Sequence, residues 1–302
     1  MSTRANTPRL SFIGFGEAGQ AIAAGLREAG VERIAAWDIL FPQAEGEKLK
    51  QAGAKIGVRL AASAADAVRE ADIIISAVTA ASSVDAAQSV KAHLSGNPFY
   101  LDINSVSPGR KQETAKLLDG RARYVDVAVM APIHPARHKT PMHIAGPQIE
   151  AIAPIMQALD MRLIVAGPQV GAAAAIKMIR GVIIKGIEAL TEECFIAATR
   201  AGIADEVAAS LVNNYPTLDW NKIVEYNIER MASHGTRRAA EMEEVADTLR
   251  ELGVEPLMAE ATVKRQRAMG VLGKQENVRA AVKQDRSTML AAVSTAAKTN
   301  SN

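Results

Sequence analysis

Three glycines near the N-terminus have the spacing of a nucleotide-binding turn. The segment GFGEAG follows the apolar run RLSFI and precedes the helix-like run QAIAAGLREAG. In a GxGxxG turn the first glycine permits a tight bend, the second lets the backbone approach a pyrophosphate, and the third lets helix and strand pack closely. The first amides of the helix then bind phosphate oxygens. The residues predicted to contact a dinucleotide here are Gly14, Phe15, Gly16, Glu17, Ala18 and Gly19.

An acidic residue stands where such a site holds the ribose. Asp38 ends the second β-rich run, RIAAWD, and is followed by Ile39 and Leu40 rather than by an arginine. A carboxylate at this point accepts hydrogen bonds from the ribose hydroxyls and repels a 2′-phosphate. We therefore predict NAD as the cofactor, with NADP disfavoured. Val78 and Thr79 end the fourth run, where the ribose and nicotinamide would lie, although a plain strand end explains them equally well.

A lysine that follows a series of very small residues is the second candidate for chemistry. In VGAAAAIKMIRGV (residues 170–182), small residues precede Lys177, so the helix can begin close against its neighbours. Projected at about 100° per residue, Lys177, Arg180 and Gly181 share one side of that helix. By itself this pattern is typical of an ordinary amphipathic helix. The position of Lys177 in the whole chain must decide between a charged face and a catalytic role.

The elements that must position these residues alternate along the first half of the chain. Short β-rich runs are separated by helical stretches or turns at a spacing that suits βαβ crossovers. This predicts an α/β domain of the Rossmann type over residues 1–167, with a doubly wound parallel sheet and helices on both faces. The predicted strands are 9–16, 33–38, 54–59, 71–78, 98–104 and 123–129, with 142–146 and 162–167 as further edge strands.

No convincing strand pattern follows in residues 168–302. We predict an all-α domain there, joined to the first by a long helix. The predicted helices are 171–200, 205–213, 219–232, 236–252 and 255–270, with breaks at Gly202, Pro216, Gly235 and Gly253.

Composition excludes several classes of protein. The 302 residues are 48% hydrophobic and carry a net charge of +2, with no segment dense in lysine or arginine, so we expect a globular protein that binds no nucleic acid. The lone Cys194 fits a reducing compartment, and its apolar neighbours predict a core position. The N-terminal MSTRANTPR lacks the apolar region of a secretory signal, and apolar runs are too short to span a membrane. We therefore expect a cytoplasmic protein.

With these features in place, the chain resembles the β-hydroxyacid dehydrogenase superfamily, which includes 3-hydroxyisobutyrate and 6-phosphogluconate dehydrogenases. The resemblance rests on IGFGEAGQAIAAGL (13–26), LDINSVSP (101–108) and VGAAAAIKMIRG (170–181). The segment RMASHGTRRAAEMEEV (230–245) is similar to a subgroup with a C-terminal domain of unknown function. The resemblance implies an oxidoreductase in which NAD takes a hydride from an alcohol carbon of a hydroxy acid or sugar acid.

The resemblance also implies roles for three residues. Lys177 would act as general acid–base on the substrate hydroxyl. Asn104 and Ser105 match the polar pair that the family places beside the nicotinamide and substrate, where an amide and a hydroxyl can orient the alcohol. The alternative for this pair is hydrogen bonding that caps the loop ahead of Ser107-Pro108. All-α domains of this superfamily tend to pair, so we expect a homodimer formed through the helical domain.

The sequence departs from the family pattern where the substrate carboxylate binds. Met130, Ala131 and Pro132 replace a serine and paired glycines. The same loop carries Arg137, which suits an anion. It also carries three histidines, whose loose spacing and lack of a cysteine or carboxylate partner disfavour a metal site. We therefore expect no bound metal.

A second departure lies on the helix of Lys177. Gly181 stands where the family usually has an asparagine, and Arg180 precedes it. Either these residues admit a larger, anionic substrate, or Gly181 allows close helix packing and Arg180 extends to solvent. His234 and Arg238 are further candidates to reach the substrate, against the default of a solvated charged face.

Two other functions remain open from the sequence. Imine reductases share this fold but usually replace the lysine with another proton donor. A nucleotide-sensing or scaffold protein on the same fold would bind NAD without turnover.

Overall fold

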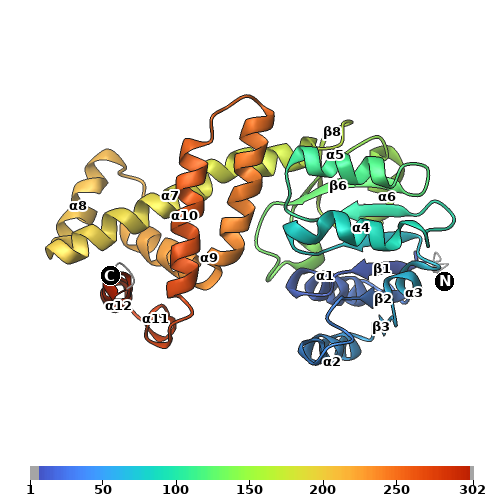
Figure 1. Cartoon of the computed structure of the whole chain (residues 1–302), viewed down its shortest axis with the longest axis horizontal. Coiled ribbons are helices and arrows are strands. Elements are labelled where there is room, and N and C mark those ends of the chain that lie inside the picture. The colour runs from blue at the N-terminus through green and yellow to red at the C-terminus, as the bar shows by residue number, and fades with distance from the viewer. Residues whose placement is uncertain (1–6, 300–302) are drawn as a thin grey trace. The chain divides into compact units, whose positions relative to one another are not determined.

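The first part of the chain builds a single sheet, and all but one of its strands lie within the predicted ranges. The computed structural model describes residues 7–299. The strands are β1 (Leu10–Ile13), β2 (Ile34–Trp37), β3 (Arg59–Leu60), β4 (Ile73–Ser76), β5 (Phe99–Asp102), β6 (Arg123–Val129), β7 (Met142–Ala145) and β8 (Leu163–Gly167). They lie in the order β3-β2-β1-β4-β5-β6-β7-β8 (Figure 1). All neighbours are parallel except β6 and β7, which are antiparallel. The predicted fold class is confirmed.

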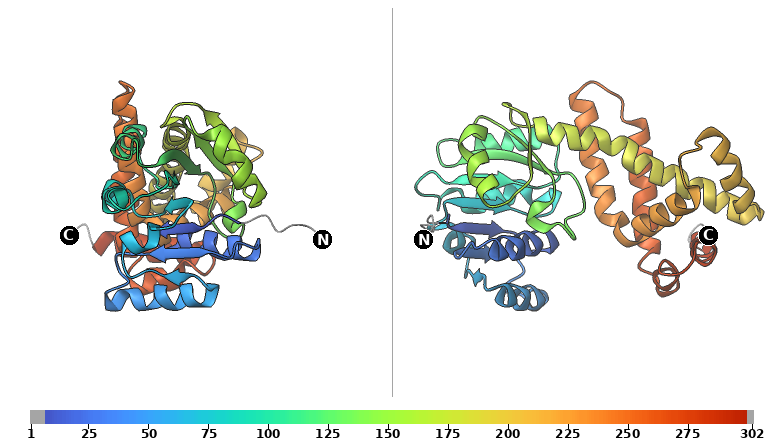
Figure 2. Two further views of the ribbon diagram at one scale, coloured as in Figure 1. Left: turned by 90° about the vertical axis from the view of Figure 1, so that its right-hand side faces the viewer. Right: turned by 180° about the vertical axis from the view of Figure 1, so that it is seen from behind.

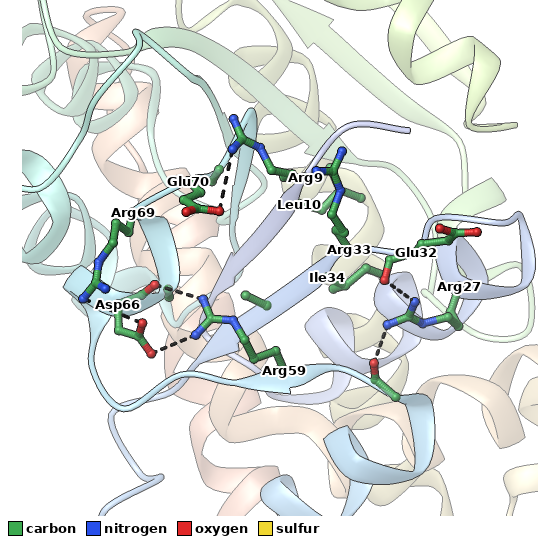
Figure 3. A pocket seen from close by; sticks show the side chains of 14 residues that line it. Arg9, Leu10, Arg27, Glu32, Arg33, Ile34, Arg59, Asp66, Arg69 and Glu70 are labelled. Atoms are coloured by element: carbon green, nitrogen blue, oxygen red, sulfur yellow. Dashed lines mark hydrogen bonds and ion pairs between the residues drawn. The ribbon is translucent and has the colours of Figure 1, made fainter. Parts of the chain in front are cut away.

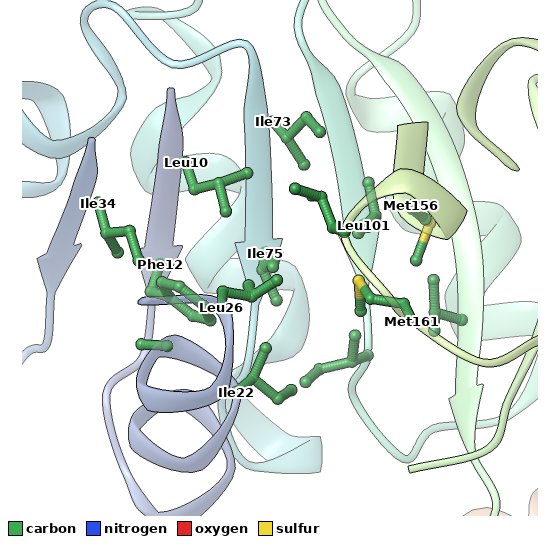
Figure 4. Close-up of a cluster of buried hydrophobic side chains, with 14 of the residues drawn as sticks. Leu10, Phe12, Ile22, Leu26, Ile34, Ile73, Ile75, Leu101, Met156 and Met161 are labelled. Carbon is green, nitrogen blue, oxygen red and sulfur yellow. The ribbon is translucent and has the colours of Figure 1, made fainter. Parts of the chain in front are cut away.

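Helices cover both faces of this sheet because alternate side chains of each strand point to opposite faces. On one face, Ile73 and Ile75 join a cluster with side chains of α1 (Glu17–Glu28) and α6 (Ile149–Ala158) (Figure 4). On the other, Ile74 packs with α3 (Ala64–Val68) and α4 (Ser83–Lys91). The remaining helices of this part are α2 (Glu47–Ile56) and α5 (Pro108–Leu117). The strand order reverses direction between β1 and β4, and in such sheets ligands bind beyond the carboxyl ends of the strands at that point.

One predicted strand is largely wrong. Most of 54–59 is not extended, because α2 continues to Ile56 and Gly57 ends it with a left-handed φ of +76°. A glycine in this conformation is a common helix C-cap. Strand β3 begins only at Arg59 and spans two residues. Of the apolar residues in this run, Ala54 and Ile56 belong to α2, where Ala54 is exposed and Ile56 half-buried, and the buried Val58 follows the helix.

The chain divides into two compact units, one ending at Met178 and the other beginning at Ile179. The division falls within α7 (Ala172–Ala201). The structure shows no strand in the described residues of the second unit, which form helices. These are α8 (Ala204–Asn214), α9 (Trp220–Glu251), α10 (Leu257–Leu272), α11 (Glu276–Ala281) and α12 (Arg286–Thr299). Within the described range, no helix combines the length and apolar character needed to cross a membrane.

The predicted break at Gly235 is wrong, since α9 is continuous through it. Helices α9 and α10 form a hairpin (Figure 2), and Gly235 lies at a point where their backbones approach closely. A Cβ on Gly235 would lie 2.6 Å from the amide nitrogen of Gly270 and would also collide with the Gln266 carbonyl. This glycine therefore serves helix packing rather than a turn.

Two further expectations concern the surface and the N-terminus. Cys194 is exposed, so the predicted core position is wrong. The adjacent Phe195 and Ile196 occupy the buried side of α7, at 1% and 6% exposure, and leave Cys194 on the opposite side. The expectation about the N-terminal MSTRANTPR falls mostly on residues 1–6, which lie outside the described residues.

Candidate functional site

The three glycines of the N-terminal turn have three different environments. Gly14 adopts φ +88°, and a Cβ on it would collide with the Ala77 carbonyl. A Cβ on Gly19 would lie 2.7 Å from the carbonyl oxygen of Gly14, so this glycine permits the close approach of α1 to β1. A Cβ on Gly16 would meet no atom within 4 Å. The space beside Gly16 and the amides at the start of α1 therefore fit a pyrophosphate.

The other residues of the turn contribute mainly backbone. The Phe15 side chain is fully buried in the core, whereas Glu17 is exposed and Ala18 half-buried. Gly16 is the N-cap of α1 and supplies no side-chain acceptor for the first amides of the helix. A bound anion would satisfy such amides.

Asp38 is held against the glycine turn. One carboxylate oxygen accepts a hydrogen bond of 2.7 Å from the Phe15 amide, and the other accepts one of 3.0 Å from the Leu40 amide. The residue is 9% exposed, and the next side chain, Ile39, is 76% exposed. The carboxylate is thus fixed at the end of β2, beside the turn that fits the pyrophosphate, as a ribose-binding carboxylate requires.

Asn104 ties the ends of β4 and β5 together. Its Oδ1 accepts a hydrogen bond of 2.7 Å from the Val78 amide, and its Nδ2 donates one of 3.0 Å to Ser76 Oγ. Asn104 is 4% exposed. These contacts hold Asn104 to the end of β4 rather than capping the loop ahead of Ser107-Pro108, and its predicted contact with the substrate stays a prediction. Beyond Val78, Thr79 Oγ1 donates to Ser82 Oγ at 3.1 Å.

The structure brings Lys177 and Ser105 together. Lys177 Nζ donates a hydrogen bond of 2.6 Å to Ser105 Oγ, although the two residues are 72 positions apart. Both side chains are partly buried. Ser105 follows β5, and Lys177 lies on the second turn of α7. The pair therefore lies at the carboxyl edge of the sheet, where the strand order places a ligand site.

The start of α7 is fixed by Asp126 of β6. One oxygen, Oδ2, accepts hydrogen bonds from the amides of Gly171 (3.0 Å), Ala173 (3.0 Å) and Ala174 (3.2 Å). A carboxylate at this position also offsets the partial positive charge of the helix N-terminus. The small side chains let the helix lie close, since Ala173 packs with β6 and β7 and with the half-buried Met130.

A buried cation that the sequence reasoning missed lies beneath this pair. Lys111 of α5 is 1% exposed, and its Nζ donates to the carbonyl oxygen of Asp102 at 2.6 Å and to its Oδ1 at 3.0 Å. Tyr124 donates to the other oxygen of Asp102 at 2.8 Å. The available signal was the presence of an aspartate at the end of β5 and another within β6, both in otherwise apolar runs.

In the loop after β6, the predicted anion-binding residue Arg137 is engaged elsewhere. Arg137 donates to Glu28 Oε1 at 2.7 Å and also pairs with Oε2, and hydrogen bonding to this guanidinium lowers the pKa of Glu28. Glu28 ends α1, about three turns from the glycine turn. The structure therefore does not bring Arg137 to Lys177. Among residues 7–299, no group of three histidine, cysteine or acidic side chains is arranged to hold a metal.

The remaining substrate-contact candidates all belong to the second unit. Arg238 is 6% exposed, and its guanidinium pairs with Glu188 of α7, with Nε at 3.0 Å from Oε2. A Cβ on Gly181 would lie 3.0 Å from Val245 of α9, which matches the close-packing alternative. Arg180 is exposed on α7, and His234 is half-buried on α9. These contacts give Arg238 a structural role, and we leave it out of the proposed substrate contacts.

A cavity of about 440 Å³ lies at the amino ends of the strands, beside the first residues of β1 and β2. Three of its arginines, Arg9, Arg59 and Arg69, pair with acidic groups, whereas Arg27 donates to backbone carbonyls (Figure 3). Arg59 pairs with Asp66 at 2.9 Å, and Arg9 lies 3.7 Å from Glu70. We do not assign this cavity to the candidate site, because the glycine turn and Lys177 lie at the other end of the strands.

Comparison with known families places this site in context. Residues 9–167 match the model of the NAD binding domain of 6-phosphogluconate dehydrogenase, and residues 198–269 match a domain of unknown function, DUF1932. The first match spans more than half of the chain. The chain therefore belongs to the family defined by this NAD binding domain, in the subgroup that carries DUF1932. This confirms the predicted resemblance and supports a nicotinamide cofactor.

Three relatives have descriptions that name no activity. A conserved hypothetical protein from Sinorhizobium meliloti 1021 is 33% identical, with a TM-score of 0.74 and coverage of 96% of this chain and 97% of that one. The conserved protein MTH1747, described as similar in structure to 3-hydroxyacid dehydrogenases, is 28% identical with a TM-score of 0.67, over 88% of this chain and 100% of its own. An uncharacterised 28.5 kDa protein of Methanothermus fervidus is 28% identical over 84% of this chain and 96% of its own.

More distant structures show the fold alone. A 3-hydroxyisobutyrate dehydrogenase of Mycobacterium tuberculosis is 16% identical with a TM-score of 0.72, over 94% of this chain and 98% of its own. An imine reductase variant of Myxococcus stipitatus, solved with NAD⁺, is 22% identical with a TM-score of 0.53, over 95% of this chain and 99% of its own. Hydroxyacid dehydrogenases and imine reductases thus share this fold.

Proposed function

We propose that the protein is an NAD-dependent oxidoreductase that acts on the alcohol group of a hydroxy acid or sugar acid, with Lys177 as general acid–base. The observation that carries the proposal is the 2.6 Å hydrogen bond from Lys177 Nζ to Ser105 Oγ at the carboxyl edge of the sheet. The Lys177–Ser105 pair lies in the same unit as the glycine turn, which has space for a pyrophosphate. A dehydrogenase needs these two features on one face of the fold.

Lys177, Ser105 and Asn104 each have a separate role in the proposed reaction. When bound, the nicotinamide supplies the hydride acceptor for the alcohol carbon. Lys177 takes the hydroxyl proton in its neutral form, or returns it when a carbonyl is reduced. Ser105 orients the Lys177 amine and can accept or donate a hydrogen bond to the same hydroxyl, because a serine does both. Asn104 keeps the loop that carries Ser105 joined to the end of β4.

The cofactor proposal is NAD rather than NADP. It is supported by Asp38, whose two oxygens are fixed by backbone amides beside the glycine turn, and by the absence of arginine at positions 39 and 40. A 2′-phosphate at this point would face the carboxylate. We expect tighter binding of NAD than of NADP in a direct titration.

The experiment measures turnover of a panel of hydroxy acids and sugar acids with each cofactor, for the native chain and for Lys177→Met. Loss of the proton-transfer group is expected to lower kcat by roughly 10²- to 10⁴-fold while cofactor binding is retained. Lys116→Met, an exposed lysine of α5, is the matched control. Equal turnover of Lys177→Met and native protein would contradict the proposal. Turnover of imines but not alcohols would point to a reductase, and cofactor binding with no turnover at all would point to a sensor.

We further propose that the substrate is a small anion and that the protein is a homodimer. The dimer proposal is supported by α7, where Ile179, Ile183, Ile187 and Leu190 form one stripe at 44%, 63%, 44% and 58% exposure. A second copy of the same uncharged stripe is self-complementary around a two-fold axis. The anionic substrate and its contacts at Arg180 and His234 stay predictions from the sequence.

A further inference from the structure

Two buried carboxylates stand directly opposite one another in the sheet. Asp102 of β5 and Asp126 of β6 are register partners, and both are 0% exposed. Each is linked to one member of the Lys177–Ser105 pair. Asp102 Oδ1 accepts a hydrogen bond of 2.9 Å from the backbone amide of Asn104, the residue immediately before Ser105. Asp126 holds the first amides of α7, immediately before the turn of Lys177.

One ammonium group serves both carboxylates. Lys111 Nζ lies 3.0 Å from Asp102 Oδ1 and 3.6 Å from Asp126 Oδ1. It also donates to the carbonyl oxygens of Asp102 (2.6 Å) and Val127 (3.4 Å), so its donors join β5 to β6. Lys111 is therefore the cationic link between the strand that leads to Ser105 and the strand that holds α7.

The charge balance makes this link necessary. Two carboxylates and one ammonium leave one negative charge in the interior, and the N-terminus of α7 offsets it with its amides and partial positive charge. A buried carboxylate with neither a cation nor donors is strongly unfavourable. Without Lys111, the two aspartates would face each other across adjacent strands, and the protein would relieve this by protonation or by movement of the chain.

We propose that Lys111 is a positioning residue: through Asp126 and Asp102 it fixes α7 and the loop after β5 so that Lys177 and Ser105 meet. The proposal rests on the proposed role of Lys177 for its effect on catalysis. Its effect on the geometry does not depend on that role. A displacement of about 1 Å at a reacting group can lower a rate by as much as about 10²-fold.

The test is a double-mutant cycle of Lys111→Met and Asp126→Asn, with Lys116→Met as the control on the same helix. The first readout is the rate at which an amine-reactive reagent modifies Lys177 as a function of pH, resolved by peptide mass spectrometry. The second is kcat and KM, and the third is cofactor binding. Lys111→Met is expected to shift the Lys177 reactivity profile and to lower kcat by roughly 10- to 100-fold, with KM and cofactor binding changed far less.

The double variant is the decisive arm. Asp126→Asn alone places an amide that can direct its NH₂ toward the Lys111 ammonium, so it is expected to be harmful. In the Lys111→Met background the same amide oxygen still caps α7, and Asp102 is then the one remaining carboxylate of the pair. The net charge of the site then equals that of the native protein, so the double variant should restore much of the native reactivity profile. A merely structural loss at two sites would instead accumulate.

Several outcomes would overturn the proposal. One is a folded Lys111→Met protein with the native Lys177 profile and kcat. Another is a double variant whose Lys177 reactivity profile and kcat are no closer to the native values than those of Lys111→Met. If Lys111→Met fails to fold, a double variant that also fails to fold overturns the proposal in the same way. If Lys177→Met retains activity, the proposed function fails, while the reactivity of Lys177 in the Lys111 variants still decides the positioning role.

Discussion

Single residues in this protein take their roles from partners that are distant in the sequence. Arg238 and Arg137 have the character of anion-binding residues, yet each is engaged by a carboxylate, Glu188 in one case and Glu28 in the other. Lys111 is a further case, because a lysine on a polar helix is ordinarily exposed but here it is 1% exposed. Side-chain type alone therefore does not separate structural from functional residues in this chain.

His138 predicts a pH dependence of stability. It is 3% exposed and packs against Gly25, and in the described structure neither ring nitrogen has a hydrogen-bond partner. Burial lowers the pKa of the imidazole below its ordinary value. The unfolded chain therefore binds this proton more readily, and stability should fall as the pH decreases from about 6.5 toward the lowered folded-state pKa.

The measurement is the thermal unfolding midpoint between about pH 7.5 and 5.5, spanning the ordinary histidine pKa. His138→Leu should show a shallower loss of stability on acidification than the native chain, because the group that takes up the proton is gone. The exposed His93 provides the control, and His93→Gln should leave the slope unchanged. Identical slopes for His138→Leu and the native protein would contradict the expectation.

At the level of elements, glycines mark the places where backbones approach each other. Gly14 and Gly19 bring the first strand and helix together, and Gly181 faces Val245 where α7 meets α9. In the second unit, Gly235 and Gly270 face each other across the α9–α10 hairpin. A glycine within a helix thus serves packing at several positions in this chain.

Substitution of Gly235 tests this packing. Gly235→Ala introduces a methyl group where the Gly270 amide nitrogen would be 2.6 Å away, so the hairpin must separate. The free energy of unfolding should fall by about 1–3 kcal/mol. The control is Gly186→Ala, in α7, where a Cβ meets nothing within 4 Å. That change should raise stability by up to roughly 1 kcal/mol through helix propensity. Urea unfolding measures both, and equal effects would refute the packing argument.

At the level of the whole molecule, a dinucleotide-binding unit is combined with a helical unit that contains a domain of unknown function. The exposed stripe of α7 is an apolar surface of the second unit that the single chain leaves uncovered. Burial of such a stripe in a partner contributes roughly 25 cal/mol per Å² of apolar surface, which favours association.

Disruption of that stripe tests the proposed dimer. Ile183→Glu places a charge on a side chain that is 63% exposed in the single chain, and it should convert a dimer to monomers because the charge would be buried at the interface. Leu252→Glu, 59% exposed beyond the end of α9, is the control and should leave the mass unchanged. Sedimentation equilibrium gives the mass directly. A native chain that is monomeric, or an Ile183→Glu protein that stays dimeric, would argue against this interface.

The sequence by itself determined the class of fold and the place of the site. The glycine spacing, Asp38 and the alternation of strands and helices are local patterns, and the chain direction of parallel strands then forces their carboxyl ends to one edge. Lys177 and Ser105 could be named in advance because each follows a recognisable element. Their contact across 72 positions is a property of the fold.

Tertiary structure alone decided which charged side chains already pair with an oppositely charged group of the protein. The partner of Arg137 lies 109 positions away and that of Arg238 lies 50 away, while Lys111 reaches aspartates on two strands. Helix and strand periodicity carry no information about such partners, because burial and charge compensation depend on contacts between distant segments. For the same reason the sequence predicted a break at Gly235, whereas the approach of α10 makes that glycine part of a continuous helix.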